Sequence, residues 1–516
     1  MRVARIPLAQ TYYSPDTSAG VGTYFLPQIG SGIVNGVIEK ASGKPCVVKR
    51  RPMTFSDTLV SIAMPSGVAY GGGLYVDQIG NGPAYGLAFA VLLDTTGAPY
   101  IAAWDGTAVV GVPGVATTAL ALGLGTGYTN VFCYSPLGST YFYVWAWSTS
   151  TGAYKVATVT ASTCVVSSTV TGPALQANIS NVVFFDNYLV ITAGAYIYNT
   201  DFQDWGLNKT VNSVTDFQAN YVAVPFNSFI TSVAYNGVYL LVATVIAVYA
   251  YIDAGNPNGS VLGIVKEATM PLGTLQLAAS PFGVGFRSFG ATNSQIFFVP
   301  FNSPTPQKIS TDSVQMNDTL APGGIFVATM FGRPFVCAQV DALLMAFDIA
   351  NGEWYVWYPP AGFVAGAVSV QQVIYQGGTS PSTTVIVRQP TAAASAGLLF
   401  SDPSEAIDSA TWQDSVNGVL SNYPFVVQTR EDDIGVGGYK TWGSATLKGL
   451  TLSASTPISV QYTDDGYQTW STLNRTVDMS MRNPVTHQLG YSQTRAWRVV
   501  YTGPNGVKLE AIEVTI

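Results

Sequence analysis

The chain alternates short apolar runs with clusters of turn-forming residues along its whole length. The apolar runs are rich in Val, Ile, Tyr, Phe and Thr, and Gly, Asn, Asp and Pro interrupt them at short intervals. Runs of this kind are typical of β-strands. An amphipathic helix needs a charged face opposite its apolar stripe, and only 10% of the residues are charged. The pattern therefore predicts an all-β protein built as a sandwich, a barrel or a propeller.

Three segments predict β-hairpins in more detail. Each has an apolar strand, a turn that ends in Gly and a second strand with aromatic residues, and the segments are 91–104, 143–154 and 343–357. Thr-Gly and Asn-Gly turns supply the positive φ at which antiparallel strands reverse. The third segment resembles the strand-turn-strand unit of a propeller blade, whose aromatic residue packs against the neighbouring blade. We therefore expect a β-propeller-like body, and the irregular spacing predicts no number of blades.

The residue composition of the sequence changes near residue 400. Small and turn-forming residues concentrate between residues 377 and 411, as in a linker or a long loop. Residues 425–516 then alternate between apolar and polar side chains, as in a separate β-sandwich. We expect an N-terminal extended arm over residues 1–60, a β-propeller-like body over 61–405 and a C-terminal β-sandwich domain over 406–516.

The charge balance limits the classes of function. The 516 residues include 29 acidic and 22 basic ones, for a formal net charge of -7. This composition lacks the basic footprint of a dedicated nucleic-acid reader. A duplex could still slide past a neutral or acidic wall without being gripped. A surface of Ser, Thr, Asn, Gln, Gly and Tyr suits broad, permanent contacts between subunits, because little charge is desolvated when it is buried.

The cysteines and the most apolar run indicate no metal site, disulfide framework or membrane segment. Cys46, Cys133, Cys164 and Cys337 lie far apart without C-x-x-C spacing, so we expect buried free thiols. The apolar run at 238–252 is shorter than the ~20 residues with which a helix spans a bilayer. The N-terminal residues show no apolar core of secretory length. We expect a soluble protein made in the cytoplasm.

Neighbouring carboxylates and a single histidine are the candidates for catalysis. The carboxylates are Glu431, Asp432 and Asp433 in one group, and Asp464 with Asp465 in another. Pairs of carboxylates act as acid and base in glycoside hydrolysis, but adjacent residues of a strand point to opposite faces, so we expect solvated turns. His487 has no Gly-x-Ser-x-Gly elbow to pair with. We expect no catalytic residue, no cofactor and no metal ligand.

Residues 463–470 resemble the Asp-box of sialidases and other propellers, with Tyr467 at the position usually held by Gly. In an Asp-box the carboxylate caps backbone amides of a turn and the Trp plugs the hairpin, so the motif is structural. Near the other end, the basic cluster Lys49, Arg50 and Arg51 precedes Pro52. We expect an exposed strand end there, and contact with DNA or an acidic partner is the alternative.

Several segments carry a resemblance to a known family. They are 183–191 (VFFDNYLVI), 201–205 (DFQDW), 233–255, 306–311 (PQKIST), 347–354, 461–471 (QYTDDGYQTWS), 489–495 (LGYSQTR) and, with Met53 where Gly is expected, 47–52 (VVKRRP). Their order resembles the packaged-DNA stabilisation proteins, also called tail hub or nozzle proteins, of short-tailed bacteriophages (podoviruses).

This resemblance implies a structural virion protein. It implies a propeller-type body, a β-sandwich end and a homo-oligomeric ring, a hexamer, assembled in the host cytoplasm and placed in the virion tail below the portal and adaptor proteins. The ring would retain packaged double-stranded DNA without sequence-specific binding and then form the conduit for genome ejection. Tail fibre, spike or needle proteins would be its other partners.

Two other classes remain open. A receptor-binding or polysaccharide-degrading tail protein would also present Tyr, Trp, Asn and Gly, because aromatic rings stack on sugars. A secreted propeller lectin is the third class, which the missing signal peptide disfavours.

Overall fold

The structure of the protein is a computed structural model. The residues that it describes are 2–9, 32–40, 46–51, 54–56, 68, 70–78, 88–104, 109–110, 119–136, 139–207, 220–255, 260–280, 283–288, 295–310, 325–330, 333–340, 343–358, 370–375, 382–387, 398–401, 412–416, 419–471, 475–482 and 484–516.

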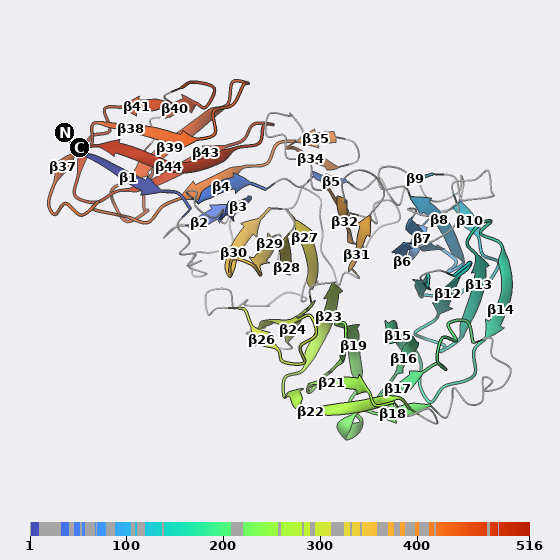
Figure 1. Ribbon diagram of the computed structural model, residues 1–516. Helices are drawn as coiled ribbons and strands as arrows, with labels where there is room; N and C mark the ends of the chain where they lie inside the picture. The colour runs from blue at the N-terminus through green and yellow to red at the C-terminus, as the bar shows by residue number, and fades with distance from the viewer. Residues whose placement is uncertain are drawn as a thin grey trace.

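Most of the chain forms a β-propeller, and the described residues contain seven blades of at least four antiparallel strands (Figure 1). The first blade holds β6 (Tyr70–Gln78), β7 (Ala88–Asp94), β8 (Pro99–Trp104), β9 (Val109–Val110) and β10 (Ala119–Ala121). The second holds β11 (Asn130–Tyr134), β12 (Tyr141–Trp147), β13 (Tyr154–Thr160) and β14 (Val166–Thr171). The third holds β15 (Ile179–Phe185), β16 (Tyr188–Ala193), β17 (Tyr196–Asn199) and β18 (Tyr221–Ala223).

The remaining blades repeat this order. The fourth holds β19 (Ile230–Tyr235), β20 (Leu240–Thr244), β21 (Val248–Asp253) and β22 (Leu262–Met270). The fifth holds β23 (Thr274–Ser280), β24 (Gly283–Ser288), β25 (Ile296–Pro300) and β26 (Gln307–Lys308). The sixth holds β27 (Ile325–Met330), β28 (Arg333–Val340), β29 (Leu343–Asp348) and β30 (Glu353–Trp357). The seventh holds β31 (Val370–Tyr375), β32 (Ser382–Val387), β33 (Leu398–Ser401) and β5 (Thr54–Ser56).

The blades close into a ring through their first strands. Each first strand contacts the first strand of the next blade, and β31 returns to β6. Separate apolar clusters fill the spaces between successive blades from the first to the sixth. The seventh blade is completed by β5, which precedes all the other propeller strands in the sequence and pairs antiparallel with β33.

The three predicted hairpins are confirmed. They are the pairs β7–β8, β12–β13 and β29–β30. Gly97, Gly152 and Gly352 occupy their turns with φ of 77°, 72° and 71°. Trp354 packs with residues of β25 in the fifth blade and its indole N–H donates to the Ile309 carbonyl at 2.9 Å, as expected of a blade aromatic.

The C-terminal part is a β-sandwich of two sheets around one core. One sheet holds β3 (Gly36–Glu39), β4 (Val47–Arg50), β44 (Lys508–Thr515), β38 (Ser444–Gly449) and β41 (Val485–His487), with β1 (Val3–Pro7) also paired to β44. The other holds β2 (Gly32–Val34), β36 (Phe425–Gln428), β43 (Ala496–Tyr501), β39 (Pro457–Thr463) and β40 (Arg475–Asp478). A small pair, β37 (Lys440–Thr441) with β42 (Tyr491–Ser492), completes the sandwich, and a second pair, β34 (Asp414–Val416) with β35 (Val419–Ser421), lies against β5 of the seventh blade.

The expected division of the chain is wrong at its N-terminal end. Residues 1–60 do not form a separate arm in their described part, because β1 to β4 belong to the sandwich and β5 belongs to the seventh blade. The stretch 377–411, expected as a linker, contributes β32 and β33 to that blade, and its other residues lie outside the described ones. The sandwich is therefore built from both ends of the chain.

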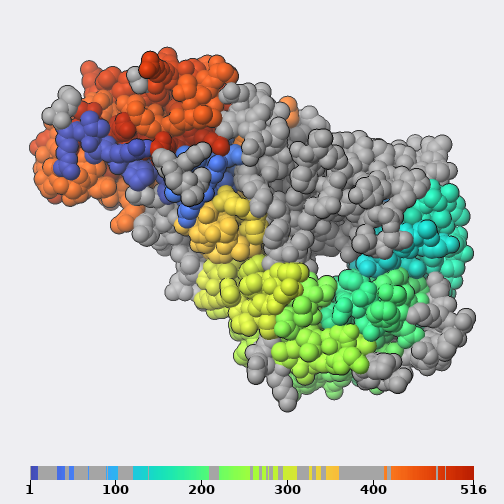
Figure 2. Space-filling model, viewed as in Figure 1, coloured from blue at the N-terminus to red at the C-terminus, as the bar shows by residue number. Residues whose placement is uncertain are grey.

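The propeller and the sandwich share a sheet. β2 pairs parallel with β30 at Val34 and Val356 and antiparallel with β36, so one nine-stranded sheet runs from the sixth blade into the sandwich. The apolar core of the sandwich likewise includes Tyr355 and Trp357 of the sixth blade. Figure 2 shows the sandwich as a lobe projecting from one side of the propeller.

Candidate functional site

The basic cluster is buried inside the chain, which overturns the expectation of an exposed strand end. Lys49 is 4% exposed, and Arg50 and Arg51 are 0% exposed. They lie where β4 leaves the sandwich toward the seventh blade, and Lys49 stands over the ring of Trp412 at 5.5 Å. Side chains buried in this way cannot contact DNA phosphates or an acidic partner.

Arg51 forms the centre of the contact between propeller and sandwich. Its Nη1 and Nη2 donate to the two carboxylate oxygens of Asp414 at 3.0 and 2.7 Å. Nη2 also donates to the Tyr358 carbonyl at the end of the sixth blade at 3.0 Å. The guanidinium stacks over the ring of Tyr423 at 3.8 Å. One side chain therefore connects the sixth blade, the β34–β35 pair and the sandwich.

Arg50 points into the sandwich, where its guanidinium lies over the rings of Tyr423 at 4.0 Å and Tyr501 at 5.1 Å. Its guanidinium donates to the carbonyls of Gly503, Asn505 and Tyr423 at 2.5, 2.8 and 2.7 Å. Burial lowers the pKa of Arg50, and it raises the pKa of Asp414 against the opposing effect of Arg51. We call Asn35, Arg50, Arg51, Asp414 and Tyr423 the junction cluster.

Asn35 is a member of this cluster that the sequence reasoning missed. It is fully buried with φ of 53°, and its side-chain oxygen accepts hydrogen bonds from Arg51 Nε at 3.0 Å and from the Tyr358 amide at 2.8 Å. Its Nδ2 donates to the Pro424 carbonyl at 2.7 Å. The signal was the Asn-Gly dipeptide at 35–36, which marks a residue with positive φ.

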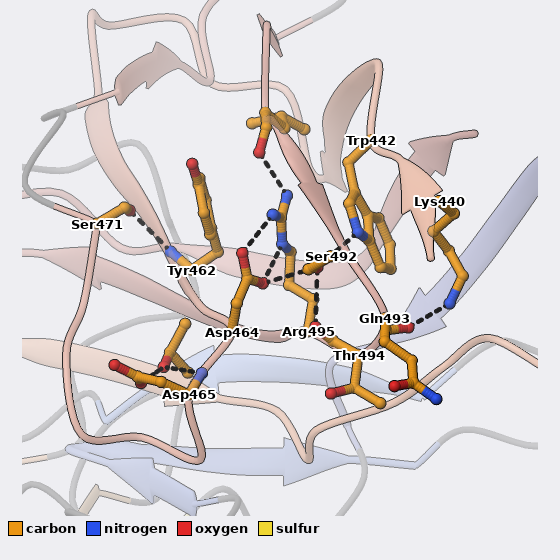
Figure 3. A network of polar contacts seen from close by, with 12 residues as sticks. Lys440, Trp442, Tyr462, Asp464, Asp465, Ser471, Ser492, Gln493, Thr494 and Arg495 are labelled. Carbon is orange, nitrogen blue, oxygen red and sulfur yellow. Dashed lines mark hydrogen bonds and ion pairs between the residues drawn. The ribbon is translucent and has the colours of Figure 1, made fainter. Parts of the chain in front are cut away.

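A second polar network lies in the sandwich near β37 and β42 (Figure 3). Asp464 accepts hydrogen bonds from Arg495 Nε and Nη2, both at 2.7 Å, and from the Ser492 hydroxyl at 3.0 Å. The indole N–H of Trp442 donates to the same hydroxyl at 2.9 Å. Arg495 also stacks over Tyr462 at 3.8 Å. The network is satisfied internally and holds the β42 strand in place.

Two tyrosines project from this network into solvent. Tyr439 and Tyr491 are 69% and 65% exposed, and their rings stack with centroids 5.0 Å apart. Lys440 beside them is buried and donates to the carbonyls of Asp433 and Gln493. We call Tyr439 and Tyr491 the tyrosine tip. The tip therefore presents two stacked aromatic rings to solvent on a fixed base.

The carboxylate cap of the Asp-box turn forms as expected, and Trp470 is half-buried. Asp465 accepts hydrogen bonds from the Thr463 hydroxyl at 2.6 Å, from the Thr469 amide at 3.0 Å and from the Thr469 hydroxyl. These bonds lower the pKa of Asp465 to about 2. Tyr467 keeps the positive φ, 70°, that favours Gly at this position, and its hydroxyl ties down the neighbouring loop. That oxygen accepts from the Glu431 amide at 2.8 Å and donates to the Thr429 carbonyl at 3.2 Å.

The other catalytic candidates are separated. Asp432 and Asp433 each accept a hydrogen bond from the amide two residues later, as turn residues do. His487 is exposed on β41. Asp464 and Asp465 face different partners, and Glu431 accepts a hydrogen bond from the Thr494 hydroxyl.

The cysteines match the expectation except at one position. Cys133, Cys164 and Cys337 are buried free thiols, whereas Cys46 is exposed. Burial raises the pKa of the Cys164 thiol to about 12. Among the described residues, no group of three His, Cys, Asp or Glu side chains could hold a metal ion. The described part of the chain also has no helix long and apolar enough to cross a membrane.

No family model and no curated protein matches the sequence. Among solved structures, the WD40 β-propeller domain of Doa1 is similar at 11% identity, with 67% of this chain and 97% of that chain covered and a TM-score of 0.40. The Dos1 propeller is similar at 10% identity, with 70% of this chain and 90% of that chain covered and a TM-score of 0.38. BamB from Moraxella catarrhalis is similar at 10% identity, with 72% of this chain and 94% of that chain covered and a TM-score of 0.38. The propeller assignment stands on the strand order of this chain, and these similarities concern the fold alone.

Proposed function

We propose that this protein is a structural subunit of a short bacteriophage tail, a hub or nozzle that assembles as a ring below the portal and adaptor. In this role it retains the packaged genome and then becomes the conduit through which double-stranded DNA leaves. The work is mechanical, and no residue of the chain is assigned a catalytic part.

The observation that carries the proposal is the fixed joint between propeller and sandwich. The two domains share the nine-stranded sheet, and the buried Arg51–Asp414 pair lies across their boundary. Domains within one chain move relative to each other unless the interface is large and apolar. A joint of this kind suits a tail component that must keep its shape against pressure from packaged DNA.

The low charge of the surface supports the same proposal. A ring subunit buries two different surfaces against its neighbours, and uncharged surfaces lose little solvation when they are buried. The propeller body and sandwich end also agree with what the sequence resemblance implies.

The test is copurification with a portal–adaptor complex, followed by mass photometry and negative-stain imaging. A closed ring with a central channel, on the portal–adaptor axis, is the expected result. A monomer at every protein concentration, alone and with the portal–adaptor complex, would contradict the proposal.

The tyrosine tip favours a second candidate, a receptor-binding tail protein. Stacked, exposed tyrosines suit the apolar faces of sugar rings. If the chain has this function, it should bind host polysaccharide, and the Tyr439→Ser and Tyr491→Ser variants should bind it less. Unchanged binding in both variants, or no binding by the parent protein, would rule out this second candidate.

A further inference from the structure

Large apolar side chains are exposed together at one end of the third and fourth blades. Phe226 is 89% exposed, Phe229 57%, Val245 45% and Ile246 46%. Phe226 lies in the short 3-10 turn η2 (Pro225–Asn227) between β18 and β19, and Val245 and Ile246 form the turn between β20 and β21. Polar residues are usual at such turns. The Val245 amide donates to the Phe229 carbonyl at 3.2 Å, so the two turns touch.

These turns belong to a continuous surface on four blades. Asn178 Nδ2 donates to the Thr149 carbonyl at 2.9 Å, and the Ile230 amide donates to the Gly194 carbonyl at 2.9 Å. A side chain at Gly273 would collide with the Val245 carbonyl. We call the residues of these turns the neutral rim, namely 148–153, 172–178, 194–195, 224–229, 244–247 and 271–273. None of them is Asp, Glu, Lys, Arg or His.

The rim displays Phe226 on a fixed backbone. Phe226 has φ of 62° and ψ of 14°, in the left-handed region that a bulky side chain rarely adopts. Backbone of this kind persists only where the surroundings hold it. Here the Val224 amide donates to the Ala195 carbonyl at 2.9 Å and the Asn227 amide donates to the Val224 carbonyl at 3.1 Å. A strained turn that holds a phenylalanine in solvent is a feature of a contact surface.

The opposite end of the same blades differs in charge. Antiparallel strands place alternate turns at opposite ends of a blade, and the turns after β15, β17 and β21 carry Asp186, Asp201, Asp204 and Asp253. Phe301, 49% exposed, and Val238, 46% exposed, also lie at that end. Exposed apolar residues therefore occur at both ends of these blades, and among their described turns the rim is the end without charged residues.

We propose that the neutral rim docks against a second copy of this chain. The inference rests on the proposed ring, and it names the surface through which the ring forms. A partner with ordinary surface composition would bring about 25% charged residues to a rim that offers no opposite charge. This chain has 10%. Its own surface is therefore the one that loses least solvation when it covers the rim.

The position of the rim favours a head-to-tail contact. In Figure 1, β18 and β22 lie at the end of the propeller away from the sandwich, whereas β37, next to the tyrosine tip, lies at the far end of the sandwich. Two different exposed surfaces at opposite ends of one subunit generate a heterologous contact, which closes into a ring when the rotation permits.

The experiment compares assembly of the full chain with that of rim variants. Phe226→Asn keeps a residue that tolerates the left-handed backbone, and Phe229→Ser removes the second ring. Phe301→Asn is the matched control at the opposite end. Mass photometry across protein concentration, in low salt and in about 1 M salt, gives the concentration at which half of the protein is assembled. Circular dichroism confirms that each variant is folded.

We expect each rim variant to raise that concentration about tenfold or more, and the Phe301→Asn control to leave it within about twofold. The shift should persist in high salt, because no ion pair contributes. A benzophenone amino acid at position 226 should crosslink two copies of the chain.

Two outcomes would overturn the inference while leaving the proposed function intact. One is a ring that assembles equally well with and without Phe226 and Phe229. The other is a crosslink from position 226 only to the portal–adaptor proteins. A parent chain that stays monomeric with and without the portal–adaptor complex would instead end the proposed function, and the inference with it.

Discussion

Replacing Asp414 by Asn should destabilise the protein strongly, because it leaves a buried cation without its anion. Arg51 is 0% exposed and Asp414 is 2% exposed at their side chains, and two hydrogen bonds join them. Removing one partner of a buried ion pair costs about 3–5 kcal/mol. Arg51 keeps its bonds to Asn35 and Tyr358, so we expect about 3–4 kcal/mol for Asp414→Asn.

The exposed pair Lys448–Glu513 supplies the matched control. Its atoms are 3.2 Å apart and its side chains are 36% and 31% exposed, so water already solvates both charges. Exposed pairs contribute about 0–1 kcal/mol. Glu513→Gln should therefore lower the free energy of unfolding far less than Asp414→Asn does.

The assay is urea denaturation at neutral pH, followed by tryptophan fluorescence, because Trp357 and Trp412 are buried near the junction cluster. The double variant Arg51→Met with Asp414→Leu should recover much of the loss, since apolar replacement of a buried pair is often neutral or stabilising. An Asp414→Asn variant that unfolds like Glu513→Gln would refute the assignment of Arg51 and Asp414 to the joint.

Further expectations follow from the Asp-box turn and the thiols. Tyr467→Phe should lower the free energy of unfolding by about 1–2 kcal/mol, because the amide of Glu431 and the carbonyl of Thr429 lose their partner; equal denaturation midpoints would contradict this. The folded-state pKa of Asp465 is lowered to about 2. Its stabilisation is thus present above the ordinary carboxyl pKa and lost as pH falls toward about 2, so the stability gap between the parent and Asp465→Asn should narrow between pH 5 and pH 2, as unfolding by urea at each pH would show. A maleimide should label Cys46 in the folded protein and label three other cysteines only after unfolding, and mass spectrometry would identify them. These are Cys133, Cys164 and Cys337.

Features set by neighbouring residues could be predicted from the sequence. The hairpin turns at Gly97, Gly152 and Gly352 follow from residues that tolerate positive φ, and the Asp-box follows from the spacing of Thr463, Asp465 and their neighbours. The all-β class likewise follows from the composition and the short length of the apolar runs. Each of these depends on about ten consecutive residues, which a sequence displays directly.

Features set by distant residues could not be predicted in this way. Lys49, Arg50 and Arg51 look like an exposed strand end because their covering residues, such as Asp414 and Tyr423, come more than 350 positions later. The N-terminal residues looked like an arm for the same reason, since β1 and β4 pair with β44. Local pattern identifies a strand but not the strand that it pairs with.

The pairing of β1 with β44 also constrains how the chain folds. Val3 lies opposite Thr515, and the amide of Arg2 donates to the carbonyl of Ile516 at 2.9 Å. On the ribosome, β1 and β4 are made before the propeller, whereas β44, with which both of them pair, is made after it. Until then their edges stay unpaired, and such edges are the places where nascent β-proteins aggregate. Contacts across such a sequence separation form slowly, so completion of the sandwich should be the late, chaperone-sensitive step in biogenesis, after the seven blades have closed.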